Sequence, residues 1–142
     1  MSDMTGEEEL QKHMAMIEYY KEQLKSLELQ FSYLQSAIAD QTKAKLTLEK
    51  LSKVKKDADM LLPIGGGAFI DATAKNPSKV LLEVGYGVVL EKTADEAAEK
   101  IGKRINDLRQ TEERISSMAQ QLQMEAAKVS DKVEQLLSEQ QK

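Results

Sequence analysis

The stretch LLPIGGGAFIDA, residues 61–72, places three consecutive glycines near the middle of the 142-residue chain. A Walker loop requires a Lys and a Ser or Thr after its last glycine, but Ala68 and Phe69 follow Gly67 here. A Rossmann loop requires the glycines to lead from a strand into a helix, whereas residues 69–73 alternate in polarity as a second strand does. The three glycines therefore predict a β-hairpin turn.

Strand-like alternation continues on both sides of this turn, from residue 60 to residue 92. Turn residues recur at 65–67, 76–78 and 85–87, so we expect four short strands in two β-hairpins. Two hairpins alone leave an apolar face exposed to water and the strand edges without hydrogen-bond partners, so we expect an obligate oligomer. The residues expected to carry oligomerisation are the apolar strand residues Ile64, Phe69, Ile70, Val80, Leu82, Val84, Val88 and Leu90.

Long charged helices are expected before and after the hairpins. Capping-box patterns begin both of them, at Thr5–Glu8 and at Thr93–Glu96. No proline interrupts either helical segment, the first of which is expected to run to about Asp59. We therefore divide the chain into a coiled-coil helix (1–59), two oligomerising β-hairpins (60–92) and a second coiled-coil helix (93–142).

Each predicted helix carries an apolar seam with a spacing of three and four residues, as coiled coils do. An antiparallel pairing fits both seams, because facing residue numbers then sum to 149 or 150 and large residues meet small ones, as Phe31 meets Ala119. The first seam is Leu10, His13, Ile17, Tyr20, Leu24, Leu27, Phe31, Leu34, Ile38, Gln41, Lys45 and Leu48. The second is Ile101, Ile105, Leu108, Glu112, Ile115, Ala119, Leu122, Ala126, Val129, Val133, Leu136 and Gln140.

Composition excludes several classes of function. The absence of Cys rules out disulfides and thiolate metal sites and favours a reducing compartment, so we expect a cytoplasmic protein. No apolar run is long enough to span a membrane, and the net charge of −4 argues against nucleic acid as the main partner. His13 has no second His with which to hold a metal, so we expect no enzyme activity, catalytic residue, metal or cofactor.

The whole arrangement resembles the alpha class of the prefoldin family. The resemblance rests on two long helices joined by two hairpins, on Leu62-Pro-Ile-Gly-Gly-Gly-Ala-Phe-Ile70, and on Val84-Gly-Tyr-Gly-Val88. The beta class of that family has a single hairpin, so four strands select the alpha class. The resemblance implies an α+β fold, in which a long antiparallel coiled-coil hairpin is joined by two β-hairpins that oligomerise into a β-barrel.

The resemblance also implies function and partners. It implies a hexamer of two alpha and four prefoldin beta subunits that binds unfolded client proteins at coiled-coil tips without ATP and delivers them to a group II chaperonin. Apolar residues gather where the first helix begins and the second ends, and Met adapts to many shapes. The expected client contacts are Leu10, Met14, Met16, Ile17, Val133, Leu136 and Leu137. His13 departs from this apolar picture.

Two alternatives stay open. Met14 and Met16 are equally well explained as core fillers beside the seam. The helices alone are equally compatible with a structural coiled-coil scaffold or adaptor protein, although a scaffold gives no reason for the two hairpins between arms of equal length. An RNA-binding helical arm is disfavoured because such arms are basic.

Overall fold

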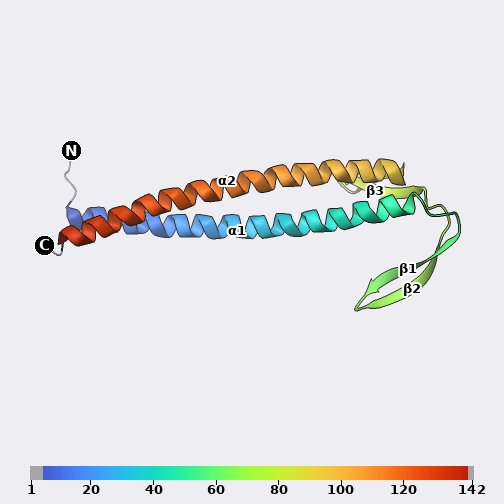
Figure 1. Ribbon diagram of the computed structural model, residues 1–142, viewed down its shortest axis with the longest axis horizontal. Coiled ribbons are helices and arrows are strands. Elements are labelled where there is room, and N and C mark those ends of the chain that lie inside the picture. Colours follow the sequence, from blue (N-terminus) through green and yellow to red (C-terminus); the bar gives the residue numbers. More distant parts are fainter. Residues whose placement is uncertain (1–4, 141–142) are drawn as a thin grey trace. The chain divides into compact units, whose positions relative to one another are not determined.

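The computed structural model describes residues 5–140 and contains two long helices connected through two β-hairpins (Figure 1). The elements follow the order α1 (Gly6–Leu51), β1 (Ala58–Gly65), β2 (Ala68–Ala74), β3 (Lys79–Gly85), β4 (Val88–Thr93) and α2 (Ala94–Gln140). Within the described residues the strands form two separate antiparallel pairs, β1–β2 and β3–β4. The predicted α+β fold of two long helices and two β-hairpins is confirmed.

The chain divides into two compact units. The terminal unit contains the first part of α1 and the last part of α2, within residues 1–36 and 109–142. The central unit, residues 37–108, contains the rest of both helices and all four strands. Each unit is described by itself below.

Both helices begin at the capping residues that the sequence predicts. The hydroxyl oxygen of Thr5 accepts a hydrogen bond of 3.2 Å from the backbone N–H of Glu8. The hydroxyl oxygen of Thr93 accepts one of 3.1 Å from the N–H of Glu96. Each bond satisfies a backbone donor that has no partner inside the first helical turn, which fixes where the helix starts.

The first helix ends earlier than expected, at Leu51 rather than near Asp59. The N–H groups of Lys53 and Val54 donate to the carbonyls of Lys50 and Leu51, three residues back, so the last turn tightens and stops. Asp57 then adopts a positive φ of 63°, and its N–H donates to Ala74 O over 2.8 Å. The chain has therefore already joined the hairpin at the point where helix was expected.

The two hairpin turns have the same geometry. Gly65, Gly66 and Gly67 have φ values of 103°, 60° and 77°, and residues 85–87 have 123°, 53° and 74°. Positive φ at both central residues is what a type I′ hairpin turn requires. In both hairpins the register shifts by one residue just before the turn, at Ile64 and at Val84. The glycine triplet is thus a turn followed by a strand, as predicted.

The predicted seams are the buried stripes of the helices. All twelve seam residues of α1 are buried or half-buried, and so are those of α2 except Gln140. In the terminal unit, Phe31 and Ala119, which the predicted register pairs, line the same groove. At the start of α1, a β-carbon on Gly6 would lie 3.9 Å from Gln140 Nε2. The helices therefore pack antiparallel within this unit.

The core of the central unit combines both helices with the second hairpin. Leu82 of β3 clusters with Ala97, Ile101 and Ile105 of α2, all nearly inaccessible to solvent. Residues of α1 pack against this cluster, among them Leu48, the predicted partner of Ile101. Arg104 of α2 also donates a hydrogen bond to the backbone carbonyl of Glu83, so side-chain packing and a polar contact both hold β3 to α2.

Candidate functional site

The seven residues predicted as client contacts lie in the terminal unit, at the end where α1 begins and α2 ends. We call this end the tip and define it as residues 5–28 and 120–140. Leu136 is buried in the seam, whereas four of the seven, Leu10, Met16, Ile17 and Val133, are half-buried. Met14 and Leu137 are 52% and 44% exposed. Two of the seven thus present large apolar side chains to solvent.

A shallow groove of about 350 Å³ opens at the tip. Met14 and Ile17 of α1 and Val133 of α2 form its apolar lining, so the structure brings three of the predicted residues together. Ile17 and Val133 are seam partners in the predicted register. The groove therefore lies along the join between the helices and offers an apolar surface that reaches solvent.

Three further groove residues, Ala15, Glu18 and Lys21, were not predicted. Glu18 follows Met14 by four residues, and Lys21 follows Ile17 by four, so their side chains neighbour predicted ones on the helix surface. Helical spacing from Met14 and Ile17 could have identified both. The Lys21 ammonium lies 3.7 Å from the Glu18 carboxylate, and both side chains are largely exposed. A charged pair thus borders the apolar lining.

His13 is half-buried in the seam of the tip, and its Nδ1 lies 2.6 Å from the backbone carbonyl oxygen of Glu9, one turn earlier. This contact keeps the imidazole along its own helix. Within residues 5–140, no group of three or more His, Cys, Asp or Glu side chains is placed to hold a metal ion.

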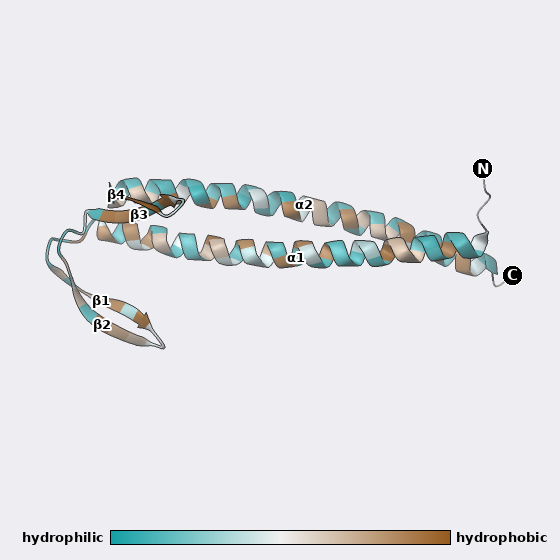
Figure 2. Ribbon diagram, turned by 180° about the vertical axis from the view of Figure 1, so that it is seen from behind, coloured by the Kyte–Doolittle hydropathy of each residue, from teal (hydrophilic) through white to brown (hydrophobic). Residues whose placement is uncertain are grey.

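The first hairpin presents apolar side chains on both faces. Ile64, Phe69 and Ile70, three of the predicted oligomerisation residues, are 53–67% exposed. Leu61 and Leu62 of the same hairpin are also exposed, although they were not predicted. In Figure 2 the hydrophobic colour covers much of the strands, while the hydrophilic colour predominates along the helices. An exposed apolar surface of this kind marks an interaction site.

The second hairpin presents a different balance. Val88 and Leu90 of β4 are about half exposed, and Val84 is half-buried. Val80 and Leu82 pack against the helices of their own chain. Two of the eight predicted oligomerisation residues are therefore engaged within the subunit, because alternate residues of β3 point toward α2.

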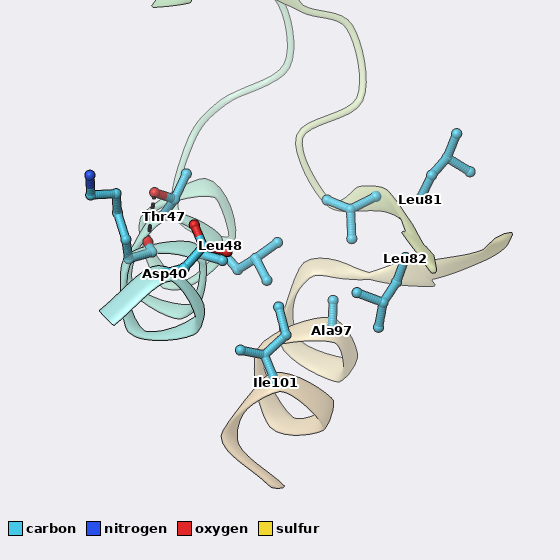
Figure 3. Close-up of a pocket in the computed structure, with 10 residues that line it drawn as sticks. Asp40, Thr47, Leu48, Leu81, Leu82, Ala97 and Ile101 are labelled. Atoms are coloured by element: carbon cyan, nitrogen blue, oxygen red, sulfur yellow. Dashed lines mark hydrogen bonds between the residues drawn. The ribbon is translucent and has the colours of Figure 1, made fainter. Parts of the chain in front are cut away.

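Beside this packed face lies a groove of about 450 Å³ between α1, β3 and α2. Leu48, Leu82, Ala97 and Ile101 point toward one another in it, whereas Leu81 points away (Figure 3). The hydroxyl of Thr47 at its rim donates to the carbonyl of Lys43 over 3.0 Å. The groove extends the core of the central unit, and the ionisable residues among its lining are Asp40 and Lys43.

Comparison with protein families identifies the class of protein that this architecture represents. Residues 20–139 match the family model described as Prefoldin subunit. The chain belongs to the prefoldin family, whose members act as molecular chaperones, and its similarity to alpha subunits places it in the alpha class. Alpha subunits of this family assemble into prefoldin complexes.

Individual relatives support the same class. The chain is 34% identical over 113 residues to the Prefoldin subunit alpha of Methanococcus maripaludis strain C5, covering 80% of this chain and 76% of the relative. It is 30% identical over 130 residues to the Prefoldin subunit alpha of Archaeoglobus fulgidus, covering 92% and 95%. The match therefore spans both helices and both hairpins.

A solved structure shares the fold. It is a cryo-EM structure of filamentous PFD from Methanocaldococcus jannaschii, with a TM-score of 0.60 and 23% sequence identity, covering 88% of this chain and 98% of that one. In the described part of our chain, no helix is both long enough and apolar enough to cross a membrane.

Proposed function

We propose that the chain is a subunit of an ATP-independent holdase that binds non-native polypeptides at its tip and transfers them to a group II chaperonin. The observation that carries this proposal is the apolar surface of the tip: Met14 is exposed in a groove beside half-buried Ile17 and Val133. Leu137 of α2 exposes a further apolar side chain at the same end. Membership in a chaperone family supports it independently.

The tip suits binding without strict sequence preference. Met is unbranched and polarizable, so it repacks against differently shaped partners. The groove is shallow and lies on helices rather than in an enclosed cavity, which allows an extended segment of an unfolded chain to lie along it. Covering Met14 and Leu137 would remove apolar area from water, and this transfer supplies the binding free energy with no need for a nucleotide.

Assembly is the second part of the proposal. We infer that the exposed faces of the hairpins join those of prefoldin beta subunits in a β-barrel, giving a hexamer of two alpha and four beta subunits. The apolar exposure of Ile64, Phe69 and Ile70 supports this, because a lone hairpin is marginally stable in water. We place the activity in the cytoplasm, which a cysteine-free composition favours, and assign no catalytic step to the chain.

A matched pair of double variants tests the tip. Met14→Ser/Leu137→Ser removes two exposed apolar side chains from the tip, and Leu29→Ser/Met118→Ser removes two exposed apolar side chains from outside it. We expect the first variant to weaken suppression of client aggregation by roughly tenfold, about 1–2 kcal/mol of lost apolar contact. The second should retain most of the wild-type suppression.

Both variants are assembled with a beta-class prefoldin subunit, and light scattering must report the same mass for each complex. Unchanged suppression by Met14→Ser/Leu137→Ser in an intact complex would refute client binding at the tip. The alternative of a structural scaffold predicts a stable oligomer that ignores beta subunits and suppresses no aggregation. Removing the whole tip, by truncating both helix ends, extends the same test.

A further inference from the structure

The net negative charge of the chain is concentrated at the tip. Its residues include ten Asp or Glu and five Lys, a net charge of −5, whereas the central unit has eleven acidic and twelve basic residues, a net charge of +1. The terminal residues outside the described range contribute Asp3 and Lys142, which cancel. The tip is therefore acidic as a whole, whereas the central unit is nearly neutral.

Helix stability accounts for the acidic residues at the start of α1 but not for those at the end of α2. Acidic residues favour helix N-termini and basic residues favour C-termini, because of the helix dipole. The first turn of α1 has Glu7, Glu8 and Glu9, as the dipole favours. The last turn of α2 has no basic residue and includes Glu139. By contrast, α1 ends with Lys50 and α2 begins with Asp95 and Glu96, so both helix ends in the central unit follow the rule.

Two of the five lysines of the tip form ion pairs with acidic residues on their own helices. Lys21 lies 3.7 Å from Glu18, and Lys128 lies 3.9 Å from Glu125. Such exposed pairs neutralise charge locally although each contributes little to stability. Outside these two pairs, the tip has eight acidic residues and three lysines, so its net negative charge remains.

Apolar contact and negative charge therefore lie side by side. Glu18 and its partner Lys21 line the same groove as Met14, Ile17 and Val133. Further carboxylates, such as Glu22 and Glu134, are exposed on the same two helices. A bound Lys or Arg side chain could lay its alkyl stem along the apolar lining while its charged end meets the surrounding carboxylates. An acidic side chain in the same place would meet like charges, which raises the cost of binding.

We propose that the tip groove selects polypeptide segments in which apolar residues are flanked by Lys or Arg, in preference to equally apolar segments flanked by Asp or Glu. This selectivity rests on the proposed function, since it requires that clients bind at the tip. Charge complementarity acts over about 10 Å at 0.1 M salt, so it also accelerates the encounter with cationic segments.

Two fluorescent peptides of equal length and identical apolar residues test the selectivity, one with Lys and one with Glu at the same flanking positions. Each is titrated by anisotropy against the complex of the full chain with a beta-class subunit. We expect the Lys peptide to bind the wild-type complex about tenfold more tightly at 0.05 M NaCl, and the preference to fall below about twofold at 0.5 M NaCl, where charges are screened. Equal affinities at low salt would overturn the proposal.

Because the beta subunits contribute charges of their own, a variant isolates the effect of this chain. Glu18→Gln/Glu22→Gln/Glu134→Gln removes three exposed carboxylates from the tip, and Glu49→Gln/Glu99→Gln/Glu113→Gln removes three from outside it. The tip variant should bind the Lys peptide about threefold to tenfold more weakly at low salt and the Glu peptide more tightly. The control should differ from wild type by less than twofold, and equal effects of the two variants would refute selection by the tip.

The Met14→Ser/Leu137→Ser variant separates the two proposals. If the variant lowers the affinity for both peptides, but the Lys and Glu peptides bind equally well, client binding at the tip is supported and the charge selectivity is refuted. If it changes neither affinity, clients bind elsewhere, and both the proposed function of the groove and the selectivity fail. Weaker binding of both peptides, together with a salt-sensitive preference for Lys, supports both.

Discussion

The two β-hairpins are built alike but face different surroundings. Gly65 and Gly85 occupy the same place in their turns, and positions twenty residues apart correspond throughout the strands. Leu62 of β1 thus corresponds to Leu82 of β3. Leu62 is 46% exposed, whereas Leu82 is 9% exposed and lies in the core with Ala97 and Ile101.

This difference shows that turn chemistry and strand pattern determine that a hairpin forms, while its neighbours determine what its apolar face does. In the second hairpin, residues such as Leu82 fasten the strands to the helices of the same chain. In the first hairpin, the corresponding face carries Leu62 and Ile70 opposite one another and both exposed. We expect the first hairpin to serve assembly and the second to serve the integrity of the subunit as well.

The largest effect is expected from Ile70→Asp in the first hairpin. An uncompensated charge in a buried interface costs about 3–5 kcal/mol, so the variant should weaken assembly with a beta-class subunit by a hundredfold or more. Light scattering of the mixture measures this. The helix content of the free chain should not change.

Leu29→Asp is the control, because Leu29 is an equally exposed apolar residue on α1. It introduces the same charge outside the hairpins and should leave assembly intact. Normal assembly of Ile70→Asp would show that the exposed face of the first hairpin is not part of the interface.

The second prediction compares the two corresponding leucines. Leu82→Ala should lower the free energy of unfolding of the free chain by about 2–3 kcal/mol, since it removes a buried side chain from the core. Leu62→Ala should lower it by less than about 0.5 kcal/mol, because its side chain already contacts water. Urea unfolding followed by circular dichroism provides both values, and equal losses would contradict the assigned difference between the hairpins.

The sequence was sufficient for the architecture because its strongest signals are local. Glycine triplets at turns, capping threonines and three-and-four spacing each act within a few residues, and the seams were predicted correctly to almost the last residue. The end of α1 was missed because the chain after Leu51 turns into the first hairpin, which Asp57 joins through a hydrogen bond from its N–H to Ala74 O. No local pattern encodes that contact.

Tertiary packing also limited what could be predicted about the sites. Val80 and Leu82 have the same apolar alternation as the strand residues of the first hairpin, so the pattern alone assigned both sets to oligomerisation. Their contact with α2 depends on how the strand leads into the helix at Thr93, where the N–H of Ala94 donates to Ser78 O over 2.8 Å. At the tip, the apolar residues were predicted, but the contribution of Glu18 to the groove was not.

The third prediction concerns the one position where the two turns differ in side chain. Tyr86 corresponds to Gly66, has a φ of 53° and is fully exposed. Left-handed backbone costs a residue with a side chain about 1–2 kcal/mol, and glycine loses part of that advantage through its freedom in the unfolded chain. Tyr86→Gly should therefore raise the free energy of unfolding of the free chain by about 0.5 kcal/mol.

Tyr86→Ala provides the control for this turn, because alanine removes the ring but keeps a β-carbon. It should leave the free energy of unfolding nearly unchanged. Destabilisation by both substitutions would instead reveal that the tyrosine ring contributes contacts to the folded chain.

The smallest effect concerns charge pairs at corresponding positions. Lys79 and Glu91 approach within 3.3 Å in the second hairpin, with both side chains about 60% exposed. The corresponding residues of the first hairpin are Asp59 and Asp71, two like charges on one face of the strand pair. Asp59→Lys should convert that repulsion into an attraction of about 0.5 kcal/mol, which corresponds to roughly twofold slower amide hydrogen exchange in β1 and β2.

Two controls test this explanation. The stabilisation by Asp59→Lys should vanish at 0.5 M NaCl. Asp59→Asn, which removes the repulsion without adding a cation, should provide about half of the stabilisation. An equal gain for Asn and Lys would mean that relief of repulsion, rather than a new ion pair, distinguishes the two hairpins.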